Sequence, residues 1–153
     1  MYLSELLESD LVLPKISCSS KDELISIVLE KIYSTGKGFP LPQEDVLKTI
    51  YLREKIGGTM LPSGLSVPHA RLQDYEGFVL ALATPTESII HDGIQIRLMA
   101  IMLSSQEGGP YYLPCLAALT KLSRDLEHFS RLCDTEKSED LISVIKERDP
   151  ELL

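Results

Sequence analysis

Two apolar runs in the second half of the chain most restrict how it can fold. They extend from Gly77 to Thr84 and from Ile94 to Ser104, and turn residues bound both. Their length favours strands that are buried on both faces over helices. Because such strands must be covered on both sides, the runs predict a β-sheet with helices packed on both of its faces.

Amphipathic helical patterns surround these runs. Ser20 followed by Glu23 is typical of a capping box, and the apolar residues after it recur with helical period until Gly36 and Gly38. This pattern predicts a helix over residues 21–34. Three further helices are expected: one from about Pro42 to Lys55, one within residues 110–124 and one over residues 138–147.

The order of these elements predicts an α/β fold with a mixed sheet. A short strand is expected from Leu65 to Val67, ending at Pro68. Helices and strands are interspersed, yet they do not alternate regularly as a strictly parallel sheet would require. With 153 residues and no repeat or linker, the chain is expected to form one domain over residues 1–153.

Composition narrows the possible functions. The formal net charge of −8 disfavours nucleic acid binding and suits a basic protein partner. The apolar runs are far shorter than the ~20 residues that span a bilayer, and the first residues do not resemble a signal peptide. We therefore expect a soluble, cytoplasmic protein that binds no nucleic acid and inserts into no membrane.

The cysteines and two of the histidines indicate no metal site. Cys18, Cys115 and Cys133 are widely spaced and are expected to be buried free thiols. His91 precedes an Asp-Gly turn and His128 lies in a charged stretch, so both are expected at the surface. We expect no metal and no cofactor.

The segment from Arg53 to Arg71 contains the residues needed to receive a phosphoryl group. It places His69 between two arginines in a loop rich in glycine and proline. A neutral imidazole can attack phosphorus while arginines and backbone N–H groups hold the phosphoryl oxygens. The alternative is a structural histidine, since a lone histidine among apolar residues is more often one.

The same segment resembles the type 2 (fructose and mannitol class) EIIA domains of the bacterial phosphoenolpyruvate-dependent sugar phosphotransferase system. The resemblance rests on R-E-K at residues 53–55, on Thr59, and on V-P-H at residues 67–69, and it covers essentially the whole chain. It implies that His69 takes a phosphoryl group from an HPr-like carrier and passes it to an EIIB domain. The chain would then be a phosphotransferase component with a phosphohistidine intermediate.

The neighbours of His69 can be given supporting roles. Arg53 can neutralise phosphoryl charge, and the Thr59 hydroxyl can donate a hydrogen bond to a phosphoryl oxygen. Glu54 is expected to orient Arg53 or a partner rather than to touch phosphate. Arg71 is a secondary phosphate-binding candidate, with a solvated surface arginine as the alternative.

The sequence departs from the family at three positions. Tyr112 stands where the family typically has a second active-site histidine, and a phenol can donate a hydrogen bond but supplies no positive charge. Pro62 replaces an expected glycine and cannot donate an N–H. Ala70 replaces the glycine that usually follows the histidine, which would matter if that position needed a positive φ.

Three functions remain open on these residues. The first is phosphotransfer through His69. The second is a regulatory protein-binding role, like that of the nitrogen-related branch of the family, which the stand-alone chain and the sequence REKIGGT favour. The third is a degenerate EIIA-like interaction domain without efficient phosphotransfer, as Tyr112 and Pro62 suggest.

Overall fold

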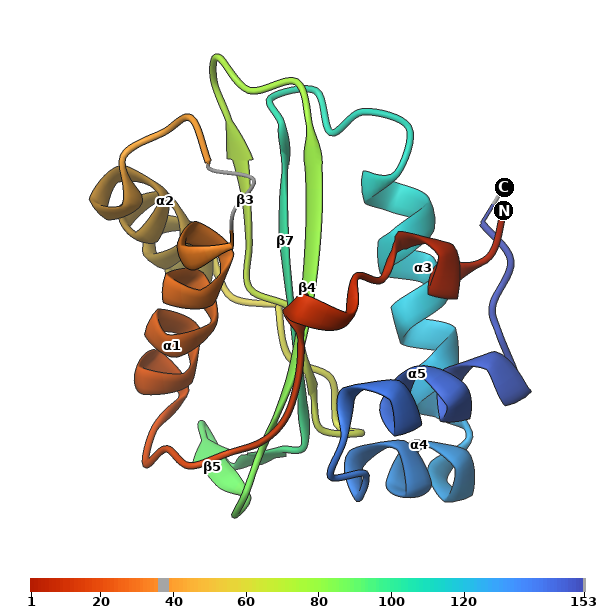
Figure 1. Cartoon of the computed structure of the whole chain (residues 1–153). Coiled ribbons are helices and arrows are strands. Elements are labelled where there is room, and N and C mark those ends of the chain that lie inside the picture. The colour runs from red at the N-terminus through yellow and green to blue at the C-terminus, as the bar shows by residue number, and fades with distance from the viewer. Residues whose placement is uncertain (36–38, 153) are drawn as a thin grey trace.

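The chain folds into a β-sheet with helices on both faces (Figure 1). The computed structural model describes residues 1–35 and 39–152. One face is covered by α1 (Lys21–Ser34) and α2 (Gln43–Ile56), and the other by α3 (Tyr112–Arg124), α4 (Leu126–Cys133) and α5 (Ser138–Glu147). The predicted α/β architecture is confirmed.

The sheet is mixed in strand direction, as predicted. Its strands are β1 (Val12–Ile16), β2 (Leu65–Ser66), β3 (His69–Leu72), β4 (Phe78–Pro85) and β7 (Leu98–Ser105). The strand order is β1-β4-β7-β2, and β3 also pairs with β7. β4 and β7 are antiparallel, whereas β1 runs parallel to β4, and both β2 and β3 run parallel to β7.

β7 is the central strand and is buried along its whole length. Leu98, Ala100 and Met102 belong to the apolar cluster formed with α3, α4 and α5. The residues between them belong to the cluster formed with α1 and α2. Burying each large apolar side chain contributes about 1.5–3 kcal/mol, so the run that suggested a two-faced sheet also stabilises it.

One strand boundary was predicted wrongly. The run from Ile94 to Ser104 is divided, because β6 (Ile94–Ile96) pairs with β5 (Ile89–His91) in a separate hairpin. Between β6 and β7, the N–H of Arg97 donates to the carbonyl of Gly64 at 2.8 Å. This tertiary hydrogen bond redirects the chain, and an apolar pattern carries no signal for it.

The helix boundaries follow the sequence closely. Ser20 caps α1, since its side chain accepts a hydrogen bond from the Glu23 N–H at 3.1 Å. The Glu23 carboxylate accepts from the N–H of Ser19 instead of Ser20, so only half of the predicted capping box forms. The predicted helix break at Gly36 and Gly38 lies outside the described residues.

Several elements were not predicted from the sequence. They are the short 3₁₀ helices η1 (Leu3–Leu6) and η2 (Ser9–Leu11), the strands β1, β3 and β5, and the helix α4. The two ends of the described chain lie side by side in Figure 1, where the N–H of Leu152 donates to the carbonyl of Met1 at 2.7 Å. The N-terminal residues thereby pack beside α5.

The prediction that His128 lies at the surface was wrong. His128 is 4% exposed, and its Nε2 lies 2.6 Å from the carbonyl oxygen of Val144 on α5. The helix α4 is amphipathic, and its charged residues lie on the side that faces solvent. His128 lies on the opposite, buried side of the same helix. His91 is 40% exposed in its side chain, at the end of β5.

Two of the three cysteines are buried. Cys115 and Cys133 are buried as predicted, and burial raises the pKa of each thiol to about 12. Cys18 is half-buried, so the prediction does not hold fully for that residue. Both belong to the apolar cluster formed with α3, α4 and α5, so they serve as packing residues.

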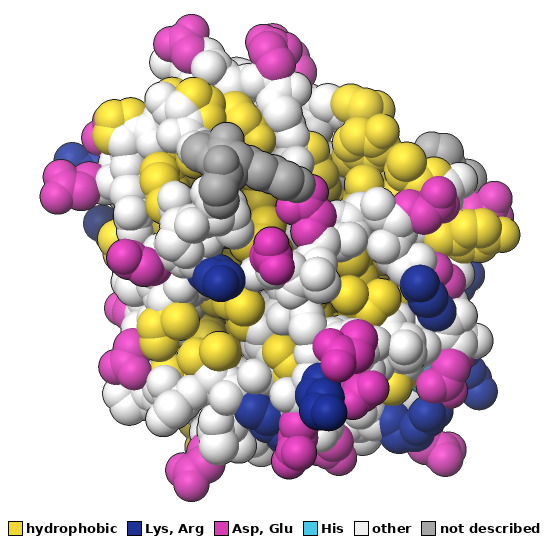
Figure 2. All heavy atoms as spheres, in the orientation of Figure 1, with side chains coloured by type: hydrophobic (Ala, Val, Ile, Leu, Met, Phe, Trp, Pro, Cys, Tyr) yellow, Lys and Arg dark blue, Asp and Glu magenta, His cyan; other side chains and the backbone are white. Residues whose placement is uncertain are grey.

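Charge is distributed unevenly over the surface. Acidic side chains are spread over the face in Figure 2, whereas basic side chains gather mainly where α4 and α5 lie. The excess of acidic residues gives the formal net charge of −8. In the part of the chain that the structure describes, the helices are too short or too polar to cross a bilayer.

Candidate functional site

His69 is the first residue of β3 and is only 5% exposed. It pairs with Met102 of β7, the central strand, which is the one strand that β3 pairs with among the described residues. The preceding residue, Pro68, accepts a hydrogen bond from the N–H of Met102 at 3.2 Å. Both sides of the Val67-Pro68 link are therefore held against β7, and the direction of the His69 side chain is fixed.

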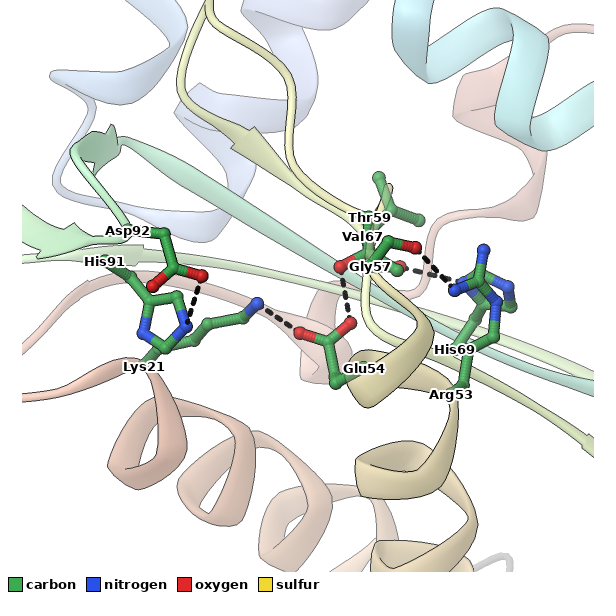
Figure 3. A network of polar contacts seen from close by, with 9 residues as sticks. All are labelled: Lys21, Arg53, Glu54, Gly57, Thr59, Val67, His69, His91 and Asp92. Atoms are coloured by element: carbon green, nitrogen blue, oxygen red, sulfur yellow. Dashed lines mark hydrogen bonds and ion pairs between the residues drawn. The ribbon is translucent and has the colours of Figure 1, made fainter.

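A backbone hydrogen bond determines which ring nitrogen of His69 is free. Nδ1 lies 2.9 Å from the carbonyl oxygen of Val67 (Figure 3). A carbonyl oxygen can only accept, so Nδ1 carries the proton and donates it. In the neutral ring, Nε2 is then left with its lone pair, as a nucleophile needs.

The charge state of His69 suits the same role. Burial lowers the pKa of the imidazole, and the positive fields of Arg53 and Arg71 lower it further. The hydrogen bond to Val67 and the carboxylate of Glu54 act in the opposite direction but do not reverse the shift. The ring is therefore neutral near pH 7.

Arg53 lies in the last turn of α2, as predicted. Its Nη1 donates to the carbonyl of Gly57 at 2.8 Å (Figure 3), and its positive charge acts on the imidazole of His69. Gly57 has a φ of 86° and ends the helix, a conformation that favours glycine. The helix end thus holds a fixed positive charge next to the candidate nucleophile.

Glu54 and Thr59 are linked to each other. The Thr59 hydroxyl donates to the Glu54 carboxylate, and the carbonyl of Thr59 accepts from the N–H of Val67 at 2.8 Å. We predicted that Thr59 donates to a phosphoryl oxygen and that Glu54 orients Arg53 or a partner. In the structure, the hydroxyl proton of Thr59 is directed at Glu54, and the carboxylate contacts Thr59 and Lys21.

Lys21 is the residue that sequence reasoning missed. It is the first residue of α1, is 5% exposed and forms an ion pair with Glu54. The two residues are far apart in the chain, so no local motif connects them. One signal was present: a lysine in the first turn of a helix opposes the helix macrodipole and calls for a specific partner.

Tyr112 lies against His69, at the position where a second histidine was expected. It is the first residue of α3, and its ring centroid is 5.4 Å from that of His69. The guanidinium carbon of Arg71 lies 4.4 Å from the centroid of the Tyr112 ring. The structure therefore brings Tyr112 and Arg71 to His69, as it does Arg53.

Pro62 and Ala70 both fit the backbone that the structure adopts. Pro62 is the second residue of a turn closed by a hydrogen bond of 3.0 Å from the Gly64 N–H to the Leu61 carbonyl, a position that proline favours. Ala70 is a buried residue of β3, and its φ is not positive. Neither departure disturbs the backbone around His69.

Comparisons with known proteins concern the sequence and the fold of the whole chain. A family model described as "Phosphoenolpyruvate-dependent sugar phosphotransferase system, EIIA 2" matches residues 5–148. A nitrogen regulatory protein of Bradyrhizobium diazoefficiens is 25% identical over 149 residues, which cover 95% of each chain.

Two solved structures show the same fold. The nitrogen regulatory protein IIA-Ntr of Neisseria meningitidis superposes with a TM-score of 0.77 at 20% identity, covering 94% of this chain and 98% of that one. A chain in the Escherichia coli complex of enzyme IIAMTL with phosphorylated enzyme IIBMTL superposes with a TM-score of 0.70 at 17% identity. The match covers 93% of this chain and 98% of that one.

Proposed function

This chain belongs to the EIIA 2 family of the phosphoenolpyruvate-dependent sugar phosphotransferase system, and we propose that it is a phosphocarrier whose acceptor is His69. The phosphoryl group comes from an HPr-like protein and passes to an EIIB partner or acts as a regulatory signal. The observation that carries the proposal is the hydrogen bond of 2.9 Å between Nδ1 and the carbonyl of Val67, which leaves Nε2 free.

Transfer to His69 needs no catalytic base. The Nε2 lone pair attacks phosphorus and forms the new P–N bond, while the bond to the donor atom breaks and the donor keeps that electron pair. The ring gains positive charge and retains its Nδ1 proton, and the Val67 carbonyl stabilises that charge. Onward transfer is the same reaction with His69 as the leaving group.

Two arginines supply the positive charge that the phosphoryl group needs. Arg53 is held at the end of α2, and Arg71 is held against the ring of Tyr112. Arg71 is an exposed residue of β3, so the contact with Tyr112 is what positions its charge. Cations that are positioned beforehand stabilise charge with little reorganisation during the reaction. The Tyr112 hydroxyl can add one hydrogen bond, and Thr59 can add another if its proton turns away from Glu54.

The surface near His69 suits a protein partner. Ile56 at the end of α2 is 79% exposed, and Leu113, next to Tyr112, is 66% exposed. Apolar side chains are enriched in the core of protein interfaces, so these two residues are candidates for contact with a partner. Such a carrier works in the cytoplasm, where a phosphorylated donor meets it.

A regulatory role is the second candidate function. It is supported by the full-length similarity to a nitrogen regulatory protein. The structural similarity to an EIIA that forms a complex with its EIIB favours onward transfer. Transfer to purified EIIB proteins separates these roles, because a regulator is labelled but passes no phosphate on.

Phosphorylation can be tested directly with enzyme I, HPr and labelled phosphoenolpyruvate. We expect an acid-labile label on the chain that is absent from His69→Ala. A label that survives this substitution, or no label on the unaltered chain, would refute the proposal. Absence of label that Tyr112→His restores would instead indicate a degenerate EIIA domain.

A further inference from the structure

Lys21 is a buried cation with no direct part in the transfer chemistry. Its side chain is 6% exposed, and that of its ion-pair partner Glu54 is 12% exposed. A buried charge is stable only when it is paired, so each residue depends on the other. The other two charged residues in the first turn of α1, Asp22 and Glu23, are acidic, as the helix dipole favours.

A continuous set of contacts joins this ion pair to the candidate nucleophile (Figure 3). Lys21 binds Glu54, and Glu54 accepts the Thr59 hydroxyl. The Thr59 carbonyl accepts from the N–H of Val67, and the Val67 carbonyl accepts from Nδ1 of His69. Displacing Glu54 would therefore disturb the link between β2 and β3 that orients the imidazole.

Glu54 also acts on His69 through its charge. The carboxylate raises the pKa of the imidazole, against the effect of Arg53 and Arg71. A carboxylate in this place favours the protonated ring, which cannot attack, and repels a phosphoryl group. The ammonium of Lys21 offsets both effects, because it contacts the same carboxylate.

We propose that Lys21 is a positioning residue for the His69 site and that it acts through Glu54. It neutralises the carboxylate electrostatically and holds it where it accepts the Thr59 hydroxyl. The inference rests on the proposed function, since it concerns phosphorylation of His69. It gives α1 a role in the site, although the site residues predicted from the sequence lie between Arg53 and Arg71 or, for Tyr112, in α3.

Two substitutions that each remove one charge test the coupling without any phosphoryl donor. Lys21→Met keeps the length of the side chain and leaves Glu54 uncompensated, so the pKa of His69 should rise. Glu54→Gln leaves Lys21 uncompensated, so that pKa should fall. The readout is the ring-proton chemical shift of His69 against pH, measured on the whole protein. If Lys21 served packing alone, the pKa of His69 would stay unchanged in both variants or would shift in the same direction in both. Either result would overturn the proposal.

The double variant makes the test independent of how well Lys21→Met folds. With both charges removed, the pKa of His69 should return close to that of the unaltered chain. Lys31→Met is the matched control, because it removes a lysine from an exposed position of the same helix. The control should leave the titration unchanged.

Phosphorylation rates complete the experiment. Phosphorylated HPr should label Lys21→Met about tenfold more slowly than the unaltered chain, and the double variant should recover most of that loss. A double variant as slow as Lys21→Met would contradict an action through Glu54. No label on the unaltered chain would refute the proposed function, while the titration would still decide the coupling.

Discussion

The two buried histidines of this protein are alike in exposure and in having a backbone carbonyl as partner, yet only His69 is proposed to react. His69 is 5% exposed and His128 is 4% exposed, and each has one ring nitrogen within 3 Å of a backbone carbonyl. The carbonyl that contacts His69 belongs to Val67, two residues earlier in the same segment. The one that contacts His128 belongs to Val144, on a different helix.

The consequences of these two bonds differ. The local bond at His69 holds the ring without linking elements, and the positive fields of Arg53 and Arg71 act on the ring. The bond at His128 connects α4 to α5 and completes a packed helix pair. Burial and a backbone hydrogen bond are common to both histidines, so the role proposed for His69 rests on the two arginines whose positive fields act on its ring.

The largest effect should come from removing the imidazole of His69. His69→Gln keeps a polar side chain of similar size but provides no lone pair that can form a phosphohistidine. We expect phosphorylation by HPr to fall at least about a thousandfold, because the nucleophile itself is lost. His128→Gln is the control and should be labelled at the normal rate. Equal loss of label in both variants would show that the comparison is mistaken.

The reverse result is expected for stability. His128→Ala removes a buried side chain and leaves the Val144 carbonyl without that partner. We expect the free energy of unfolding to fall by about 2–4 kcal/mol, from the lost packing and the unpaired polar group. Urea denaturation measures this change. The phosphorylation rate of the folded protein should stay the same, and a fall in that rate would give His128 a part in the site.

His128 also shows where sequence reasoning fails. The stretch around it is rich in charge, and periodicity over a helix of eight residues is too short to assign its buried side. By contrast, α1 and α5 were predicted with the residue limits observed, since each carries a long amphipathic pattern. The fold was therefore predictable wherever one element alone contains the signal.

The residues of the candidate site were likewise predicted where one segment contains them, and missed where packing between helices brings them together. Arg53, Thr59 and His69 were found because one segment contains them all, and Arg71 closes that segment. Lys21 was missed because its pairing with Glu54 depends on how α1 packs near the end of α2, which no local pattern encodes. The direction of the Thr59 proton is likewise a property of that packing.

A smaller effect is expected from Tyr112, which holds one of the cations that distinguish His69. Tyr112→Leu removes the ring beneath Arg71, and a cation–π contact is worth about 0.5–2 kcal/mol. The phosphorylation rate should fall about tenfold. Tyr112→Phe keeps the ring and should stay within about threefold, unless the hydroxyl itself binds the phosphoryl group. Stopped reactions with labelled HPr measure both rates, and equal losses in the two variants would favour the hydroxyl.

The smallest effect is the pH dependence of stability that His69 contributes. Burial, with Arg53 and Arg71, lowers the pKa of the folded imidazole below its ordinary value of 6.5. Below about pH 6.5 the unfolded chain therefore binds a proton that the native ring resists, and stability decreases as the pH falls through the folded pKa. Above about pH 6.5 the contribution of the neutral ring is fully present.

The comparison with His69→Gln isolates this contribution. Every other residue, His128 included, is the same in both proteins, so its contribution cancels when their free energies of unfolding are subtracted at each pH. The free energy of unfolding of the unaltered chain, minus that of the variant, should decrease as the pH is lowered from about 7 to about 5. If this value increased on acidification instead, the imidazole would take up a proton more readily in the folded chain than in the unfolded one. The hydrogen bond to Val67 and the carboxylate of Glu54 would then outweigh burial and the two arginines at the His69 ring.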